Sequence, residues 1–187
     1  MRGISGSFRR ALALSIVIIT LAVATQPARA DTAAEVRRDV YAALDKLYDR
    51  SPFARVLAET ARGILVFPNV VQAGLVIGGQ YGEGALVKGG RVVGYYNTAG
   101  ASYGLQAGAQ TYGYALFLMS DQALAYLDKS SGWEVGVGPT VVVVDEGMAE
   151  SLTTTTLSED IYAFVFGQKG LMAGIGLQGN KITKLDK

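Results

Sequence analysis

The sequence of 187 residues contains no cysteine and no histidine. Without cysteine, the chain forms no disulfide, no thiol nucleophile and no cysteine-based zinc site. Without histidine, it lacks the most common general base and the most common metal ligand, and it cannot build a Ser-His-Asp arrangement. We therefore predict a non-enzymatic protein with no catalytic residues, no metal site and no cofactor.

Carboxylate pairs, Ser-Lys dyads and tyrosine remain as catalytic options, and carboxylates could also bind calcium. Acidic residues cluster at Asp145, Glu146 and Glu150, and again at Glu159 and Asp160. Both clusters fall at predicted strand ends or loops, and no window has the spacing of a calcium-binding loop. We interpret them as solvated loop charges, with the paired carboxylates of a glycosidase or a calcium site as the alternatives.

The first 30 residues have the pattern of a cleavable signal peptide. Three arginines precede an apolar run over residues 11–25, and Ala28-Arg29-Ala30 has the small-x-small form of a cleavage site. The apolar run is shorter than the roughly 20 residues that a membrane-spanning helix needs. The sequence therefore predicts an exported, periplasmic or secreted protein, with a signal peptide at 1–30 and one domain at 31–187.

Residues 31–187 carry 13 lysines and arginines against 16 aspartates and glutamates, a net charge of −3. A mildly acidic domain has no general attraction to nucleic acid or anionic membranes, so binding to anions requires a local basic patch. We expect no nucleic-acid partner. Cations do gather in the N-terminal part of this region, but acidic residues match them in number, so they form either a solvated face or a membrane-facing side.

Two helices are predicted at the start of this domain. Apolar residues recur at three- and four-residue spacing over residues 33–49, with charged residues on the opposite arc. Ser51 and Pro52 then have the form of an N-cap and a first helical residue. The second helix is expected to run to about Arg62 and to end at Gly63 in the left-handed conformation.

The remainder predicts a β-rich core. Short runs of β-branched and aromatic residues, among them 64–67, 73–77 and 92–96, alternate with glycine-rich turns, and residues 88–91 and 178–181 have the form of two-residue hairpins. One central helix is expected after an N-cap at Ser120. The apolar run 141–144 predicts a strand covered on both faces. The fold class is therefore α+β, with a mostly antiparallel sandwich or a rolled, barrel-like sheet.

Ten tyrosines are present, and six of them fall in the first half of the β-rich region. These six are Tyr81, Tyr95, Tyr96, Tyr103, Tyr112 and Tyr114. Tyrosines in strands either pack in half-buried positions or line a surface that binds lipid or glycan, and the sequence leaves both open.

Six motifs follow one another along the chain. They are ARGILVFP (61–68), YGEGA (81–85), GYYN (94–97), SYGLQAGAQ (102–110), SGWEVG (131–136) and FVFGQKGLM (164–172). In this order they resemble the SYLF domain, a lipid-binding family found in eukaryotic membrane-trafficking and actin-patch proteins and in bacterial envelope proteins. The resemblance covers roughly residues 36–184.

The resemblance implies binding to anionic phospholipid through basic residues and an amphipathic N-terminal helix, with phosphoinositides preferred by eukaryotic members. The residues it assigns to lipid contact are Arg37, Arg38, Arg55, Arg62 and Lys169. Arg62 occupies a position where many members have lysine. Many bacterial relatives are lipoproteins, whereas this chain lacks cysteine, so we expect reversible, peripheral membrane association without a lipid anchor.

Two other function classes remain open from the sequence. One is an envelope scaffold that binds protein or glycan. The other is an outer-membrane β-barrel, although the continuous apolar runs depart from the alternation that such strands require. The actin-binding role of some eukaryotic members is not carried over to an exported protein.

Overall fold

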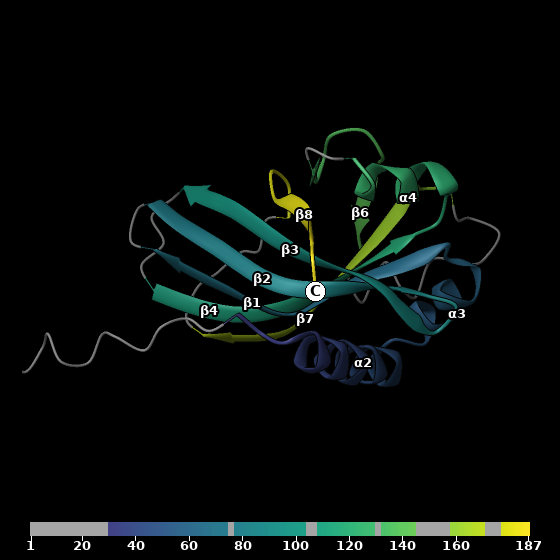
Figure 1. Cartoon of the computed structure of the whole chain (residues 1–187), viewed down its shortest axis with the longest axis horizontal. Coiled ribbons are helices and arrows are strands. Elements are labelled where there is room, and N and C mark those ends of the chain that lie inside the picture. Colours follow the sequence, from purple (N-terminus) through teal and green to yellow (C-terminus); the bar gives the residue numbers. More distant parts are fainter. Residues whose placement is uncertain (1–29, 75–76, 104–107, 130–131, 145–157, 171–176) are drawn as a thin grey trace, which may run out of the picture. The chain divides into compact units, whose positions relative to one another are not determined.

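The computed structural model describes residues 30–74, 77–103, 108–129, 132–144, 158–170 and 177–187. Residues 31–187 form one compact unit. Its elements in chain order are α2 (Ala33–Arg50), α3 (Pro52–Thr60), β1 (Gly63–Gly74), β2 (Ile77–Lys88), β3 (Arg91–Tyr103), β4 (Gly108–Leu118), α4 (Asp121–Leu127), β5 (Trp133–Glu134), β6 (Val141–Val143), β7 (Ile161–Gly170) and β8 (Lys181–Leu185) (Figure 1).

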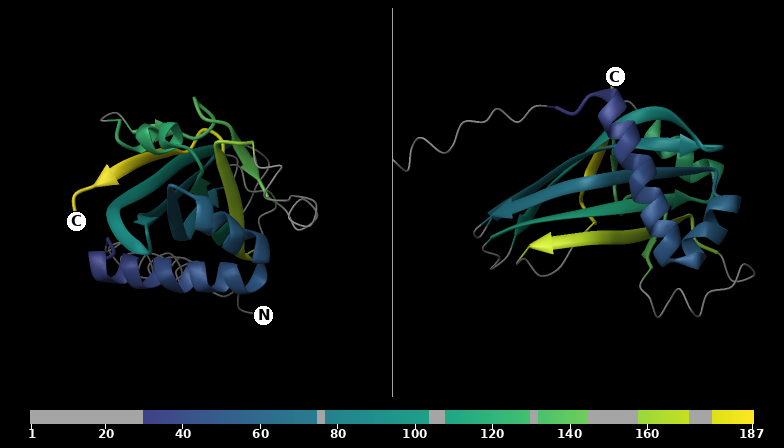
Figure 2. Two further views of the ribbon diagram at one scale, coloured as in Figure 1. Left: turned by 90° about the vertical axis from the view of Figure 1, so that its right-hand side faces the viewer. Right: turned by 90° about the horizontal axis from the view of Figure 1, so that it is seen from below.

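All eight of these strands belong to one sheet, in the order β5-β8-β3-β2-β1-β4-β7-β6. Neighbours pair antiparallel except β6 and β7, which pair parallel. The sheet curls into a half-barrel, with α2 and α3 on its outer side and α4 on its inner side (Figure 2). The predicted α+β class is confirmed, and of the two predicted arrangements the rolled sheet is the one that forms.

The first helix forms where its periodicity predicts it. Its start is fixed by a capping box, in which the Thr32 side chain accepts from the backbone N–H of Glu35 and the Glu35 carboxylate accepts from the N–H of Thr32. Its buried residues, Val36, Val40, Ala43, Leu44 and Leu47, face the outer side of the sheet. Ser51 caps α3 as predicted, since its hydroxyl accepts from Ala54 N at 3.2 Å.

The core lies on both sides of the sheet. On the outer side, α2 and α3 pack against alternate strand residues such as Val66, Ala85 and Phe117. On the inner side, the intervening strand residues, such as Leu65 and Leu116, pack with α4 and with the segments that hold β5 and β8. This half of the sheet is therefore apolar on both faces, which explains the continuous apolar runs in its strands.

A β-bulge at Pro68 lets a central strand contain proline. Pro68 has no N–H to donate to a ladder, and the register of β1 shifts there against both β2 and β4. Because the bulge adds one residue, Phe67 and Val70 both face the inner side although they are three positions apart. The bulge thereby divides β1 into a half covered by helices and a half beyond them.

The hairpin predicted at residues 88–91 is confirmed. Gly89 and Gly90 have φ of 54° and 75°, so both occupy the left-handed region that a tight hairpin of this kind requires. At 178–181 the turn forms with positive φ at Gly179 alone, before β8. The strand predicted at 171–177 falls almost wholly outside the described residues.

Three local predictions are wrong. The run 73–77 is not one strand, because β1 ends at Gly74 and β2 begins at Ile77. Gly63 does not cap α3 in the left-handed conformation; the helix ends at Thr60, Ala61 turns to an extended conformation, and Gly63 begins β1. Val143 is 49% exposed rather than covered on both faces, because β6 lies at the end of the sheet.

Close strand packing at Gly84 gives a test of the fold. A methyl group there would overlap the carbonyl oxygen of Val66, whereas at Gly79, on the same strand, the nearest atom would be 3.9 Å away. We expect Gly84→Ala to lower the free energy of unfolding by about 1–3 kcal/mol in a denaturant titration. The matched variant Gly79→Ala should leave it unchanged or slightly raised, because alanine reduces the freedom of the unfolded chain. Equal stability of the two variants would contradict the packing described.

Candidate functional site

The part of the sheet beyond α2 and α3 presents an exposed row on its outer side. Cα partners in register carry this row across six strands, from β7 through β4, β1, β2 and β3 to β8. Its members are, in order, Lys169, Thr111, Val71, Tyr81, Ala99 and Lys181, and all six are exposed. Residues directly opposite each other on paired strands point to the same face. We call this set the outer row.

A second level of small residues continues the surface. Ala109, Ala73, Gly79 and Ala101 are in register with one another two positions further along their strands, and all are exposed. Three large apolar side chains on this side of the sheet, Val71, Ile77 and Tyr81, are 52%, 67% and 49% exposed. None of the residues in these two levels is acidic. The result is an apolar surface with one lysine at each side.

The inner side of the same strands is polar. Gln110, Gln72 and Gln80 lie in register across β4, β1 and β2, and they are only 2%, 3% and 6% exposed. Gln110 Nε2 donates to Gln72 Oε1 at 2.9 Å, and Gln168 Nε2 donates to Gln110 Oε1 at 3.3 Å. These three glutamines, Gln72, Gln110 and Gln168, therefore hydrogen-bond to one another.

Two buried tyrosines extend this network. The Tyr112 hydroxyl donates to Gln80 Oε1, and the Tyr114 hydroxyl donates to Thr98 Oγ1 at 2.7 Å. Gln80 in turn donates to Asn180 Oδ1 in the turn before β8. Burial raises the pKa of Tyr112 to about 12 and raises that of Tyr114 as well. Of the tyrosines named from the sequence, Tyr96, Tyr112 and Tyr114 are buried in the inner cluster, and Tyr81 is half exposed on the outer row.

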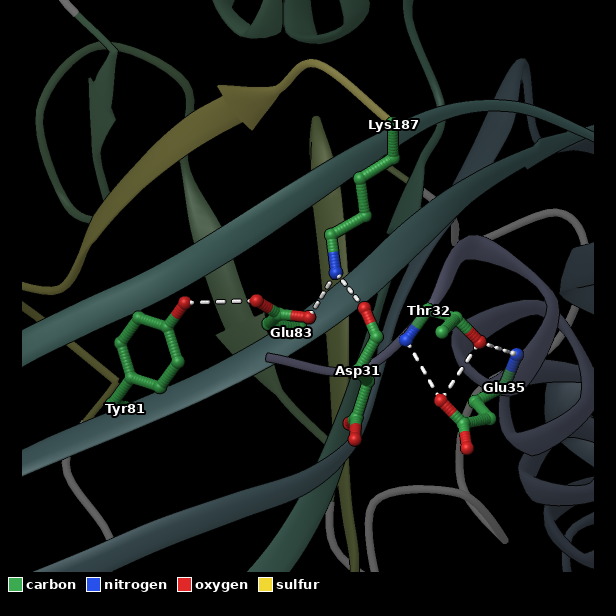
Figure 3. A network of polar contacts seen from close by, with 6 residues as sticks. All are labelled: Asp31, Thr32, Glu35, Tyr81, Glu83 and Lys187. Carbon is green, nitrogen blue, oxygen red and sulfur yellow. Dashed lines mark hydrogen bonds and ion pairs between the residues drawn. The ribbon is translucent and has the colours of Figure 1, made fainter. Parts of the chain in front are cut away.

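A compact ion pair removes the nearest acidic charge from the outer surface. Glu83, two residues from Tyr81 on β2, contacts the Lys187 ammonium, and the two side chains are 7% and 15% exposed (Figure 3). The same ammonium donates to the carbonyl oxygen of Asp31, just before the capping box of α2. Tyr81 donates to the other oxygen of Glu83 at 3.1 Å. Glu83 is therefore neutralised, and it ties the beginning of α2 to β2.

The arginines proposed from the resemblance lie elsewhere and are mostly paired. Arg38 contacts Asp39 at 2.9 Å, Arg55 contacts Asp49 at 3.7 Å, and Arg62 contacts Asp121 at 3.6 Å. The hydrogen bond from Arg38 to Asp39, and then the charge of that carboxylate, raise the pKa of Arg38. Arg37 is exposed on α2 and makes no ion pair with a described carboxylate.

The structure does not gather the five proposed residues into one patch. Arg62 precedes β1 beside the end of β4, where its N–H donates to Leu118 O, and Leu118 pairs with Ile161 at the start of β7. Lys169 lies eight residues along β7 from Ile161, about 26 Å at the usual rise of a strand. Only Lys169 belongs to the outer row.

Sequence reasoning missed Lys181 and the apolar members of the outer row. A signal for them was present. On β1 and β2, exposed Val71, Ala73, Ile77 and Tyr81 alternate with buried Gln72 and Gln80, which is the two-residue period of a strand with its amide face turned inward. Interpreting the glycines of this region as breaks and bends between short strands concealed that period.

The acidic cluster at 159–160 has a structural role at Asp160. Its carboxylate accepts from Ser120 Oγ at 3.0 Å and from Thr140 N at 3.3 Å, so it joins the start of α4 to the start of β6. Asp145, Glu146 and Glu150 lie outside the described residues. Over the parts that the structure describes, no three Asp, Glu, His or Cys side chains are placed to hold a metal ion, and no helix is long and apolar enough to cross a membrane.

Comparison with known proteins bears on the C-terminal half. Residues 99–187 match the model of the Ysc84 family, described as a Las17-binding protein actin regulator. This segment is similar to the Ysc84 (SYLF) domain. The match confirms the resemblance drawn from the motifs and, at family level, indicates a membrane- or actin-related binding domain. The search of curated proteins returned no match.

The match to Ysc84 includes β4, α4 and β5 to β8 in full but only the last five residues of β3. It therefore contains the lysines at both sides of the outer row, Lys169 and Lys181. The apolar centre of the row, Val71 and Tyr81, comes from the hairpin that precedes the matched segment.

The buried tyrosines give a test of the inner network. Burial raises the pKa of Tyr112 from 10 to about 12. Between these two pH values the hydroxyl of Tyr112 keeps its proton in the folded state and loses it in the unfolded state. The stability contributed by the neutral hydroxyl is complete below pH 10 and is lost as the pH rises toward 12. We expect Tyr112→Phe to reduce this alkaline loss in the free energy of unfolding by up to about 2–3 kcal/mol.

Denaturant titrations at several alkaline pH values would measure the effect. Tyr114 remains in the variant, so part of the loss should persist. Tyr41→Phe, which removes a hydroxyl beside the 89–90 turn, is the matched control. The same alkaline slope in wild type and Tyr112→Phe would contradict a buried, neutral Tyr112.

Proposed function

We propose that the domain binds anionic phospholipid surfaces reversibly, through the outer row and the small residues beside it, and that it acts by binding rather than catalysis. The observation that carries this proposal is the reversed polarity of the sheet beyond the helices. There, amide and hydroxyl groups fill the inside while valine, isoleucine, tyrosine and alanine face outward. A surface in contact only with water favours the opposite arrangement, and a contiguous exposed apolar surface is typical of an interaction site.

The composition of this surface suits the boundary between headgroups and acyl chains. Valine and isoleucine side chains can enter the boundary of the acyl chains. Each half-exposed side chain that leaves water contributes about 1 kcal/mol to the free energy of binding. Tyr81 combines an apolar ring with a hydroxyl, a form common at membrane interfaces. Alanine and glycine between them let the sheet approach closely without a protruding polar group.

Electrostatics orient the contact. Lys169 and Lys181 stand at the two sides of the row, and each lysine near an anionic surface contributes about 1 kcal/mol. Lys181 is in register with Glu134 on β5, so we expect Lys169 to contribute more. The Glu83–Lys187 pair keeps a carboxylate from repelling phosphate next to Tyr81.

The arginines belong to the proposal in a secondary role. Arg37 and Arg38 belong to the first half of α2. The helix α2 lies on the side of the sheet that also carries the outer row (Figure 2). Both arginines are solvent-exposed and can contact lipid headgroups when the outer row is bound to the membrane surface. Arg55 and Arg62 lie near α3, beside carboxylates that reduce their attraction for anions.

Export to the bacterial envelope is part of the same proposal. It is supported by the arginines, the apolar run and the cleavage pattern of residues 1–30. With no cysteine to accept a lipid anchor, the contact described above would itself hold the domain at the membrane surface.

The lysines provide the first test. We expect Lys169→Gln with Lys181→Gln to weaken binding to vesicles of mixed anionic and zwitterionic phospholipid roughly tenfold or more, measured by flotation or sedimentation at low salt. Lys88→Gln with Lys129→Gln removes the same charge away from the row and should change binding little. Arg38→Gln with Arg62→Gln should have a smaller effect than the lysine pair. If the arginine pair matters and the lysine pair does not, lipid contact through the outer row is wrong.

The apolar centre provides the second test. We expect Val71→Ser with Ile77→Ser to weaken vesicle binding about tenfold or more at every salt concentration, because the lost term is burial rather than charge. Val93→Ser with Val137→Ser is the matched control, since these valines are 55% and 56% exposed outside the row. Both double variants should retain the unfolding midpoint of the wild type. Equal vesicle binding by the two would remove the apolar contact from the proposal.

A further inference from the structure

The half-barrel has an open seam between its two terminal strands. β5 and β6 are the two ends of the strand order, and neither has a second neighbour among the described strands. A groove of about 590 Å³ runs along this seam. Val135 and Leu177 line it from the β5–β8 edge, Pro139, Val141 and Val143 line it from the β6 edge, and Glu159 lines it from the segment before β7.

The main chain of β6 is oriented for pairing on its free side. Ile161 N donates to Thr140 O at 3.1 Å and Val144 N donates to Ala163 O at 2.8 Å, so residues 140 and 144 direct these groups toward β7. Strand geometry then directs the N–H and C=O groups of Val141 and Val143 away from β7, along the groove. A free strand edge of this kind is a template for an added strand.

The edge is held in place before any partner arrives. Asp160 accepts from Thr140 N and Oγ1 at 3.3 and 3.5 Å, and the Thr140 hydroxyl accepts in return from Asp160 N at 3.3 Å. Asp160 also binds Ser120 at the start of α4. A pre-ordered edge reduces the entropy lost when a peptide pairs with it.

We propose that this seam binds an extended segment of a partner protein, which adds a strand beside β6. Strand addition uses main-chain hydrogen bonds for affinity and pockets for alternate side chains for specificity. The valines, proline and leucine of the groove select apolar side chains at alternate positions of the partner. Glu159 at the rim makes no ion pair with a described residue and selects a basic side chain. The partner segment therefore alternates apolar and basic residues.

The test uses residues 31–187 and a fluorescent, end-blocked peptide of alternating valine and lysine. We expect saturable binding by fluorescence polarisation. Val143→Pro should weaken it at least tenfold, because the ring removes an N–H that faces the groove and leaves the ladder to β7 intact. Val143→Thr keeps that N–H and is the matched control. Glu159→Gln should weaken binding several-fold and make it less sensitive to salt.

Several outcomes would overturn the proposal. They are no saturable binding by the wild type, equal binding by Val143→Pro and Val143→Thr when both unfold at the wild-type midpoint, or a valine–glutamate peptide that binds as well as the lysine peptide. A concentration-dependent dimer that Val143→Pro abolishes would assign the edge to a second copy of this chain instead. If Val143→Pro fails to fold, peptide binding by Glu159→Gln is compared with that of the wild type, and equal binding by these two proteins would overturn the proposal. Vesicle binding should be unchanged in all three variants, so this test is independent of the lipid-binding proposal.

Discussion

The arrangement of this domain depends on how far its helices extend over a single curled sheet. Strands of 10 to 13 residues, such as β1, β2, β3 and β7, are longer than the width that α2 and α3 cover on the outer side. Where the helices lie, the strands are apolar on both faces. Beyond the helices one face has no cover, and the chain responds by placing its amides inside and its small and apolar residues outside. The outer row is the direct consequence of that limit.

The bulge at Pro68 marks the boundary between the two halves. On its helical side, strand residues alternate between two apolar clusters. Beyond it, Gln72 accepts a hydrogen bond from Gln110 and lies in register with Gln80, and Val71 faces solvent. A buried amide row stabilises one register strongly, because a slip by one residue would expose the glutamines and bury the opposite face. The polar interior therefore fixes which residues the outer surface presents.

Much of the fold could be predicted because its signals are local. The helix at 33–49 has a clear period, Ser51 and Ser120 are recognisable caps, and Gly89 and Gly90 specify a hairpin. The exposure of Val143 could not be predicted, since it depends on β6 lying at the end of the strand order. Gly63 has the right residue type for a helix terminus, but pairing of β1 with Leu118 on β4 takes it into the sheet.

The candidate site was harder to predict because its members come from six strands. Lys169 was identified through a motif, but its neighbours Thr111 and Val71 are 58 and 98 positions away in sequence and meet it only through strand register. The arginines are close together in sequence, which suggests a basic patch. Asp39, Asp49 and Asp121 show why closeness in sequence is a weak guide to charge, since a carboxylate lies beside each of Arg38, Arg55 and Arg62 once the chain folds.

The same half-barrel offers two chemically distinct surfaces, and their separation has a physical cause. The outer row consists of side chains that project from one face of the sheet, and we propose that it contacts a surface such as a lipid headgroup layer. The seam includes β6, which has no second neighbour among the described strands, and we propose that it pairs with an extended backbone. Closing the sheet into a full barrel would remove the seam and leave the row. Lengthening α2 would cover the row and leave the seam. An incompletely closed and incompletely covered sheet is therefore what allows one small domain to present both surfaces at once.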